Sequence, residues 1–479
     1  MASRRDMFQS YQFMVQRVIS GIVLRETDPL QTPLRKMSGS GFASLMIAVV
    51  ALAGTGLIGL FFKSSDSTWK EADAVIIEEE SGATFVYLDL TDNDEDDKLL
   101  YPTANFSSAA LLARKPDFVT VSHQSLLEAT RGPELGIIDA PDSLPLPDLM
   151  LEGEWTLCSL AAETVSGEVT PNTALVVGVG TSSGADVSET AVVVRDIEVE
   201  TLHLVWKGRQ YPINNENAVL EGLILRNETE VEVGTAWLNA LPVGRALQPN
   251  PVPGLGAPSN VIPGALVGEV RVVEEGGNRQ YYQVATDTIV EITEVQSAIL
   301  RADPLVRDTV YGGIPTDAQP LPASAVSDAD RVPLDPPLPT DPPVDIPDPA
   351  TIASEKPTIC ASFESDQAAP VISIEAAVDG VRDSGETQQE TEAGTVLADL
   401  VVVEPGHGTI VEGRASPSAT TGTLYLITDE GRRYKLASAD AQAFLGYQGF
   451  TPLVLPESLI ARIPAGSTLD RTAALIPVG

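Results

Sequence analysis

The chain has 479 residues, with 30 Lys and Arg against 67 Asp and Glu and a formal net charge of −37 at pH 7. Such an acidic chain argues against binding to DNA or RNA, because phosphate contacts need clustered Lys and Arg. Three histidines leave little scope for a histidine-rich metal site. The 36 Pro, 38 Gly and 5% aromatic residues favour many short strands and turns over one large helical core.

The first 36 residues predict a basic amphipathic helix. Ser3 and Asp6 have the spacing of a capping box, with Asp in place of Glu or Gln. Residues then recur at helical spacing along one stripe, with a basic residue beside it: Phe8, Tyr11, Val15, Arg17, Val18, Ile19 and Ile22. Such a helix beside a membrane lies on the anionic leaflet, packs on a partner or only sets orientation. We favour a partner-binding helix, because a stripe with Phe, Tyr and two Met exceeds what a charge signal requires.

An uncharged stretch predicts one membrane-spanning helix, placed at residues 37–63. Residues 41–62 read GFASLMIAVVALAGTGLIGLFF; at about 1.5 Å per residue they reach roughly 33 Å, enough to cross a hydrocarbon core of about 30 Å. A cleaved signal peptide has a shorter apolar region nearer the N-terminus, and a buried core helix seldom lacks charge for so long. Residues 1–63 carry +4 and residues 64–479 carry −41. The positive-inside rule therefore places the N-terminus in the cytoplasm and residues 64–479 outside.

The remaining sequence predicts an α+β fold of small sheets, because Val-, Ile- and Thr-rich segments alternate with turn clusters and short helical pieces. One hairpin unit recurs, with its turn and returning strand marked in the first copy by Gly208, Arg209 and Tyr211 and in the second by Gly431, Arg432 and Tyr434. The two glycines are expected to supply the positive φ that a tight turn needs.

Further copies of this unit are less clear. Residues 278–281 form a partial third copy, and residues 401–413 are a candidate for a more diverged fourth. Repeated small units are typical of a stacked, elongated body rather than of a single enzyme pocket.

The two cysteines, Cys158 and Cys360, both follow the predicted span. An even pair in an oxidising compartment predicts one disulfide, and two buried free thiols are the alternative. A loop of this length gives about 5 kcal/mol by the chain-entropy model, as an upper value.

Motifs for chemistry are weak, so no catalytic, cofactor or metal site is predicted. Gly178, Gly180 and Gly184 follow an apolar strand, but the lysine and helix of a phosphate loop are missing, and a turn is the better interpretation. The match of Gly180, Ser182 and Gly184 to G-x-S-x-G lacks its helix and partner residues. Residues 92–97 begin like a calcium loop but lack the required Gly and Glu, which indicates a solvated loop.

The N-terminal run SYQFMVQR at residues 10–17, then RETDP at residues 25–29 and a single span, resembles the EccB family of type VII (ESX) secretion systems. The pattern Arg131-Gly132-Pro133, followed by Trp155 and Cys158, is similar to that family as well. The resemblance implies a cytoplasmic helix, one span and an exported core domain with four repeat domains around it. It also implies the disulfide between Cys158 and Cys360.

With this plan, the chain is divided into a cytoplasmic helix segment, a transmembrane helix, a core domain in two parts, repeat domains and a Pro/Asp-rich extended loop. The corresponding boundaries are 1–36 (helix segment), 37–63 (transmembrane), 64–160 (core, first part), 161–248 and 249–332 (repeats), 333–358 (loop), 359–418 (core return and repeat) and 419–479 (repeat). The loop is expected to be extended and solvated, since residues 333–349 hold eight Pro and four Asp.

The resemblance implies a non-catalytic scaffold subunit of a secretion complex in the plasma membrane. The implied partners are the EccC motor ATPase, EccD, EccE, the mycosin protease and further copies of the chain. A cell-wall-binding module is one alternative. A weak ATPase, proposed for the family, is another, although these residues show no Walker motif.

Overall fold

The computed structural model describes residues 3–24, 68–90, 98–163, 167, 169–378, 381 and 387–478. Contacts divide the chain into two compact units, residues 1–73 with 123–128 and residues 74–122 with 129–479. The predicted span at 37–63 and the acidic loop at 92–97 lie outside the described residues. Among the helices within the described ranges, none combines the length and apolar character needed to cross a membrane.

The described part of the first unit is helical and contains α1 (Arg4–Leu24), a 3-10 turn η1 (Thr68–Glu71) and α4 (His123–Leu126). The predicted capping arrangement of α1 is present in part, because Asp6 bonds back to Ser3 but the Ser3 side chain accepts from Arg5 instead of from Asp6. Arg5 N–H donates to Ser3 Oγ at 3.1 Å, and Ser3 N–H donates to Asp6 Oδ2 at 3.0 Å. Two of the backbone donors that have no partner inside the helix are thereby satisfied.

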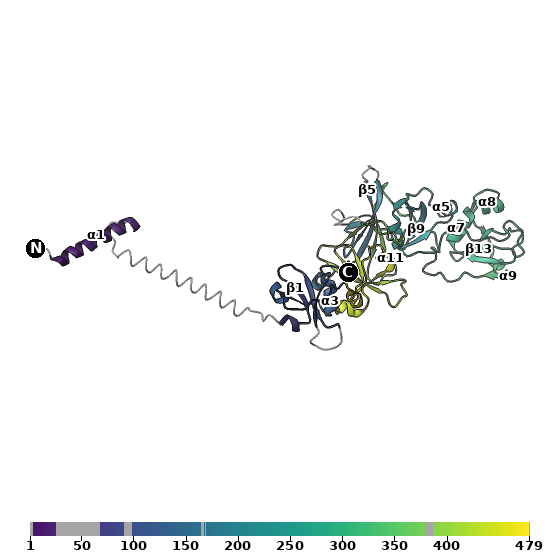
Figure 1. Ribbon diagram of the computed structural model, residues 1–479. Helices are drawn as coiled ribbons and strands as arrows, with labels where there is room; N and C mark the ends of the chain where they lie inside the picture. The colour runs from purple at the N-terminus through teal and green to yellow at the C-terminus, as the bar shows by residue number, and fades with distance from the viewer. Residues whose placement is uncertain are drawn as a thin grey trace. The chain divides into compact units, whose positions relative to one another are not determined.

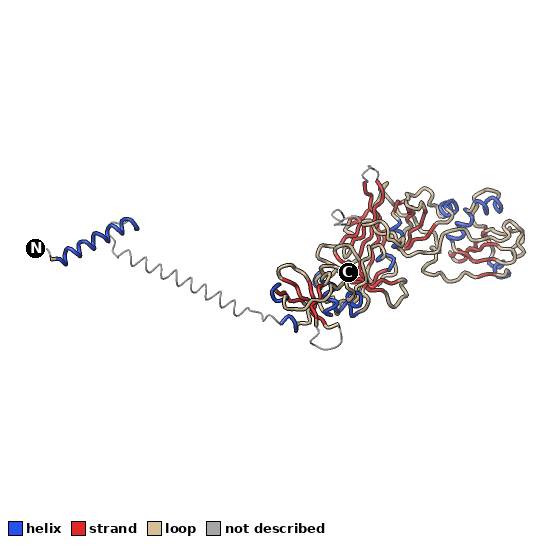
Figure 2. The backbone as a smooth tube through the Cα atoms, in the orientation of Figure 1, coloured by secondary structure: helices blue, strands red, loops and turns tan. Residues whose placement is uncertain are grey.

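The described residues of the second unit form five sheets joined by short helices and loops (Figures 1 and 2). One sheet is central, and four smaller sheets lie before, between and after its strands in chain order. The first of these consists of β1 (Val75–Glu78), β2 (Thr84–Leu88), β3 (Leu99–Pro102) and β4 (Phe118–Val121), and the second of β8 (Val192–Asp196), β9 (Thr201–Trp206), β10 (Arg209–Pro212) and β11 (Val231–Val233). The third consists of β12 (Val270–Glu275), β13 (Asn278–Val284), β14 (Ile289–Ile292), β15 (Gln319–Pro320) and β16 (Arg331–Val332), and the fourth of β20 (Gly408–Arg414), β21 (Thr423–Thr428), β22 (Arg433–Lys435) and β23 (Leu453–Pro456).

These four sheets share one order of connection. In each, three successive strands pair antiparallel, a helical segment follows, and the next strand returns parallel to the first. The connecting helices are α3 (Phe106–Ala113), α5 (Glu216–Gly222), α7 (Glu294–Ala302) with α8 (Pro304–Tyr311), and α10 (Ala439–Phe444). Asn105, Asn215, Thr293 and Ser438 cap α3, α5, α7 and α10 in the same way, each accepting from the N–H three residues on.

The central sheet has six strands in the order β19-β6-β5-β17-β18-β7. Its strands are β5 (Trp155–Glu163), β6 (Val169–Val176), β7 (Ser183–Asp186), β17 (Ile359–Phe363), β18 (Val371–Ala377) and β19 (Leu400–Val402). The main hydrophobic cluster joins this sheet to residues of β8, β11, β20 and β21. Trp237 of α6 (Thr235–Ala240) is fully buried there and donates its indole N–H to Leu157 O at 3.1 Å.

The connecting helices bring the sheets together in two pairs. Residues of α3 and α10 share one hydrophobic cluster, to which α12 (Arg471–Ala474) contributes, so the first and last of the four sheets have a common core. Residues of α5 and α7 share another (Figure 1). The contact is close, because a Cβ on Gly222 would lie 2.7 Å from Ala298 O. The remaining short helices are α9 (Ala323–Asp328), α11 (Glu457–Ile460) and the 3-10 turn η3 (Pro147–Leu149).

The third copy expected at residues 278–281 lies in a sheet with the shared order of connection, but its match was aligned with the wrong strand; the fourth copy expected at residues 401–413 was wrong. The match at residues 278–281 falls on β13, the second strand of its sheet, whereas the matched residues of the first copy lie on β10, the third strand. Residues 401–413 do not form a hairpin, because β19 belongs to the central sheet and β20 opens the last one. Both segments have hairpin-like composition, but composition does not determine which strand of a unit a segment occupies.

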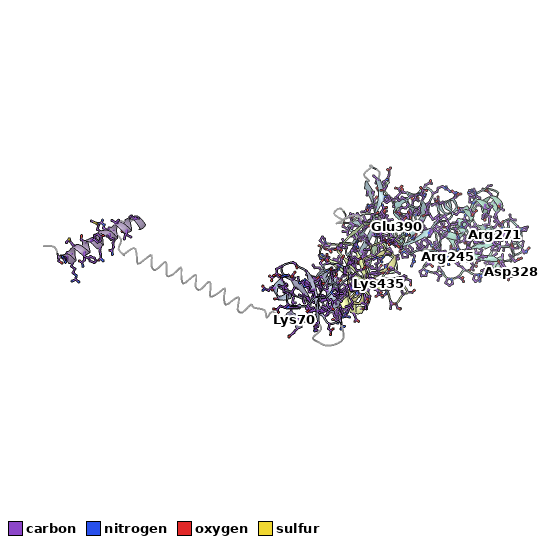
Figure 3. All side chains as sticks on the ribbon, viewed as in Figure 1. Lys70, Arg245, Arg271, Asp328, Glu390 and Lys435 are labelled. Carbon is purple, nitrogen blue, oxygen red and sulfur yellow. A yellow bond between two sulfur atoms is a disulfide. The ribbon has the colours of Figure 1, made fainter. Side chains whose placement is uncertain are left out.

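The Pro/Asp-rich segment is only partly solvated. Residues 333–340 are mostly exposed, but residues 340–350 bond to segments that flank the sheet of β8 to β11. Arg245, labelled in Figure 3, donates its N–H to Thr340 O at 2.7 Å and pairs with Asp341 at 2.8 Å. Ala191 N–H donates to Asp348 O at 2.8 Å. A proline has no backbone N–H to donate, but its carbonyl can still accept a hydrogen bond. An extended segment with eight prolines can therefore still bind to neighbouring backbone N–H groups.

Candidate functional site

The two predicted hairpins have their turn glycines at the tips, with φ of 65° at Gly208 and 66° at Gly431. Both hairpin tips pack closely against the central sheet or a loop next to it. A Cβ on Gly208 would lie 2.2 Å from Pro370 O, and one on Gly431 would lie 3.2 Å from Val401 O. Arg432 is exposed in its turn. These glycines allow both the left-handed turn and the close approach.

Tyr211 and Tyr434 are each 1% exposed and have the same neighbour, a glycine. A Cβ on Gly244 would lie 2.2 Å from Tyr211 Cε1, and one on Gly466 would lie 2.2 Å from Tyr434 Cε1. Burial raises the pKa of Tyr434 to about 12 and raises the pKa of Tyr211 as well. Each tyrosine therefore holds the segment after its helix against its sheet.

Sequence reasoning missed a third instance of this contact. A Cβ on Gly132 would lie 2.3 Å from Tyr101 Cε1, in the sheet of β1 to β4. The signal was present, because a leucine follows the glycine by three positions in all three cases, at Leu135, Leu247 and Leu469. Each leucine forms an isolated parallel bridge with the residue that directly follows the strand of its tyrosine, which gives the three copies the same closing geometry.

The predicted disulfide between Cys158 and Cys360 is confirmed. The two residues lie directly opposite each other on β5 and β17, with Cα atoms 4.0 Å apart, and both are fully buried. The bond joins the two middle strands of the central sheet and links residues 202 positions apart in the chain. Its place in the core is typical of a structural disulfide.

The predicted partner-binding residues lie on α1. The exposed fractions are 61% for Phe8, 67% for Tyr11, 55% for Val18 and 77% for Ile22. Val15 and Ile19 are half-buried. The Arg17 guanidinium lies 5.8 Å from the centre of the Phe13 ring. The helix therefore presents aromatic and aliphatic side chains to the surface, together with arginines.

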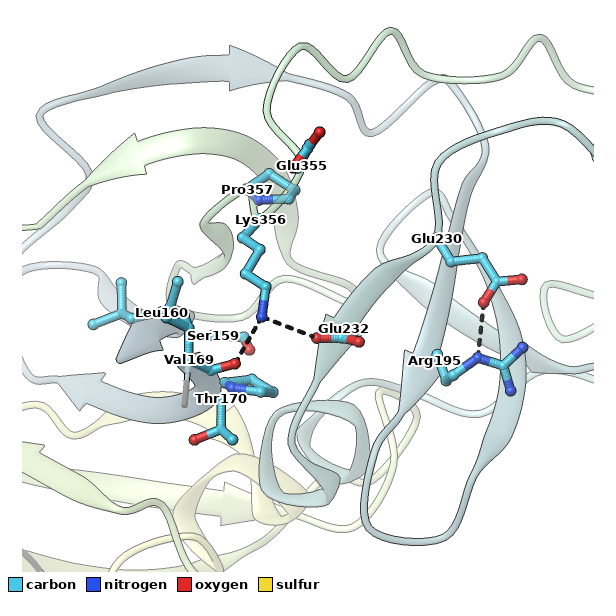
Figure 4. Close-up of a pocket in the computed structure, with 12 residues that line it drawn as sticks. Ser159, Leu160, Val169, Thr170, Arg195, Glu230, Glu232, Glu355, Lys356 and Pro357 are labelled. Carbon is cyan, nitrogen blue, oxygen red and sulfur yellow. Dashed lines mark hydrogen bonds and ion pairs between the residues drawn. The ribbon is translucent and has the colours of Figure 1, made fainter. Parts of the chain in front are cut away.

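One cleft of about 160 Å³ lies between the central sheet and the sheet of β8 to β11. Figure 4 shows Lys356 reaching into it, where Nζ donates to Val169 O at 2.7 Å and lies 3.9 Å from Glu232. Arg195 Nε pairs with Glu230 at 2.7 Å. Because Glu355 also lines the cleft, the residues around it include three carboxylates and two cations. The excess of negative charge disfavours binding of a nucleoside triphosphate, which is itself strongly negative.

The weak motifs have structural roles in the described residues. Gly178 has φ 76° and packs on Leu151, and the sequence after it forms β7 instead of a helix. His407 lies 3.9 Å from Glu404. His203 is partly buried, and this burial lowers its pKa, which leaves the ring neutral at pH 7. None of these observations assembles a nucleophile with a base.

Comparison with known proteins defines the class as a transport component of a type VII secretion system. A family model described as "Type VII secretion system ESX-1, transport TM domain B" matches residues 1–478. The chain therefore belongs to the EccB family, as the N-terminal motif predicted.

The relatives match along nearly the whole chain. The ESX-3 secretion system ATPase EccB3 of Mycolicibacterium smegmatis is 28% identical, with 98% of this chain and 90% of that protein covered. The ESX-1 secretion system ATPase EccB1 of Mycobacterium tuberculosis is 26% identical, with 97% and 93% covered.

Two solved structures have a similar fold. The EccB3 dimer from the ESX-3 core complex has a TM-score of 0.59 and 24% identity, covering 84% of this chain and 100% of that one. A chain of the intact ESX-5 inner membrane complex has a TM-score of 0.58 and 22% identity, covering 100% and 96%.

Proposed function

We propose that this chain is a non-catalytic structural subunit of an ESX inner membrane secretion complex, present in more than one copy. The family match over residues 1–478 supports this role, as do the relatives described as parts of such complexes. The N-terminus lies in the cytoplasm, a single helix at 37–63 spans the plasma membrane, and residues 64–479 form the outer body. Within that body we propose a core domain built on the central sheet and repeat domains built on the other four sheets, in place of the boundaries predicted from the sequence.

The observation that carries the proposal is the apolar surface of α1. Phe8, Tyr11 and Ile22 are more than half exposed, although burying Phe8 or Ile22 would contribute about 1.5–3 kcal/mol each. We assign this face to contact with the membrane-embedded partners, the EccC motor ATPase, EccD and EccE. The outer body meets the mycosin protease.

The test is co-purification of partner subunits with tagged full-length protein extracted gently from its own membrane. Val18→Asp places a charge in the exposed stripe and should release the chain from the complex. Gln9→Asp, half a helical turn away around the axis, is the matched control and should leave the complex intact. Complete retention of all partners by Val18→Asp would contradict this role for α1.

Two alternatives are tested with the same preparation. The names of the relatives include "ATPase"; hydrolysis by full-length protein freed of the motor subunit, and lost on mutation of a defined pocket, would favour an enzyme. Pelleting of the protein with purified peptidoglycan would favour a cell-wall-binding module. A lone monomer or dimer after gentle extraction would count against membership of a complex.

A further inference from the structure

The cleft that Lys356 enters contains a buried hydroxyl group whose hydrogen-bonding capacity is unused (Figure 4). Ser159 of β5 lines the cleft and is 2% exposed, and its Oγ has no hydrogen-bond partner among the described residues. Thr173, directly opposite on β6, is fully buried, and its Oγ1 is unpartnered within the same residues. Because an unpaired buried hydroxyl costs free energy, two on one face of a sheet favour a polar occupant from outside the chain.

The charges around the cleft favour an occupant with a single positive charge. Arg195 Nε bonds to Glu230 at 2.7 Å, so these two groups satisfy each other. Lys356 Nζ donates to a backbone carbonyl, and at 3.9 Å it is too far from Glu232 to donate to that carboxylate. Glu232 therefore keeps acceptor capacity for a further ammonium group. With Glu355, the three carboxylates and two cations around the cleft leave a net charge of −1.

The cleft has the size and the walls for a short alkyl chain. Its volume of about 160 Å³ is close to the roughly 150 Å³ of a cavity that holds benzene, so it accommodates a group of about six heavy atoms. Its lining includes the apolar residues Leu160, Ala161, Pro171 and Pro357. A lysine-type side chain, with four methylene groups and one ammonium nitrogen, matches this volume and these walls. A nucleotide or a sugar chain exceeds the volume.

We propose that this cleft binds a primary ammonium group on an alkyl stem of about four carbons. The ammonium donates to the Glu232 carboxylate and to Ser159 Oγ, and the stem contacts the apolar walls. The cleft lies between the central sheet and the sheet of β8 to β11, so the occupant joins the two. This site does not depend on the proposed function. A free amine and a lysine side chain of another protein both carry the required chemistry.

The first test measures binding of n-butylammonium, the side chain of lysine without its backbone, to full-length protein in detergent. Saturation-transfer difference NMR, corrected for protein-free micelles, should give a dissociation constant of about 1 mM, as expected for so small a ligand. 1-Butanol has the same shape without the charge and should bind at least about tenfold more weakly, because hydrogen bonds to charged groups are the stronger ones.

Variants assign the charge recognition to one carboxylate. Glu232→Gln should weaken n-butylammonium binding by about tenfold. Glu189→Gln removes a charge at a side chain that is 81% exposed and outside the cleft, and it should leave binding unchanged. Equal binding of the amine and the alcohol, or amine binding that survives Glu232→Gln, would overturn the inference.

Ser159→Ala separates an unfilled ligand site from a site already satisfied by water. Without ligand, the variant should keep its melting temperature or raise it by up to about 2 °C, because it removes an unpaired buried hydroxyl. It should also weaken n-butylammonium binding about three- to tenfold. A lower melting temperature of the ligand-free variant would show that the hydroxyl has a structural partner such as water, and would overturn the inference.

A blocked tripeptide with a central lysine distinguishes the two sources of the amine. Binding as tight as that of n-butylammonium would identify the occupant as a lysine side chain of a polypeptide, because the mouth of the cleft then accepts a peptide backbone. Binding of the free amine alone would identify a small diffusible amine. Binding of neither probe would refute the site.

Discussion

Gly466→Ala should loosen the last sheet through a single methyl group. The new Cβ would lie 2.2 Å from Cε1 of Tyr434, a ring that is 1% exposed and cannot rotate away. The backbone is also held, because Gly466 N–H donates to Arg433 O at 2.9 Å and Leu469 N–H donates to Lys435 O at 2.7 Å. Overpacking of this kind costs about 1–3 kcal/mol.

Hydrogen exchange measured by mass spectrometry on the full-length chain reports this cost locally. Since about 1.4 kcal/mol corresponds to a tenfold change, amides of β22 should exchange roughly 5–150 times faster in Gly466→Ala. The equivalent peptide of β10 should keep its wild-type rate and acts as an internal control.

Two variants separate steric overlap from other effects of alanine. Ser467→Ala changes the adjacent exposed position and should leave exchange unaltered. Tyr434→Leu combined with Gly466→Ala should recover part of the lost protection, because the smaller side chain leaves room for the methyl group. Wild-type exchange in Gly466→Ala would refute the reasoning that backbone–ring contact closes each unit.

Three further predictions follow from the same structure. Replacing both Cys158 and Cys360 by Ala should lower the free energy of unfolding by up to about 5 kcal/mol, measured by denaturant titration, while a fall below 1 kcal/mol would contradict a structural role. Burial raises the pKa of Tyr425 to about 12 from 10.0, so its contribution to stability is complete below pH 10 and is lost as pH rises toward 12; Tyr425→Phe should flatten the thermal stability profile over that range. Deleting residues 476–479 removes the bond from Val478 N–H to Glu134 O and should speed exchange at residues 134–137, and unchanged rates there would show that the C-terminal pairing is dispensable.

Much of this organisation could be predicted from patterns in the sequence. The helix cap at Ser3 depends on local spacing, and the hairpin glycines Gly208 and Gly431 occupy turns that only a few residue types allow. The disulfide followed from an even cysteine count and a compartment argument. Each of these features depends on a few neighbouring residues or on a simple count, so long-range packing does not alter it.

Features that depend on pairing between distant segments were harder to predict. The sheet containing Tyr101 was not recognised as a further copy, because the recurring part is a tyrosine and a glycine about thirty residues apart with little identity between them. The docking of residues 341–350 depends on Arg245 and Ala191, which nothing in a proline-rich composition specifies. The Ser159 hydroxyl, unpartnered among the described residues, has no sequence signal, since a serine in a strand is ordinary until its neighbours are known.

The core shared by α3 and α10 has a consequence for the order in which the protein matures. Residues 75–140 are synthesised first, yet part of their hydrophobic surface is covered only by residues 410–474. At a synthesis rate of about 5–20 residues per second, roughly 15–55 s pass between the completion of residues 75–140 and the first of residues 410–474. During that interval the first of the sheets to be made has no partner for its helix, whereas α5 and α7 are made within about 4–16 s of each other. The middle of the body can therefore consolidate before its beginning does.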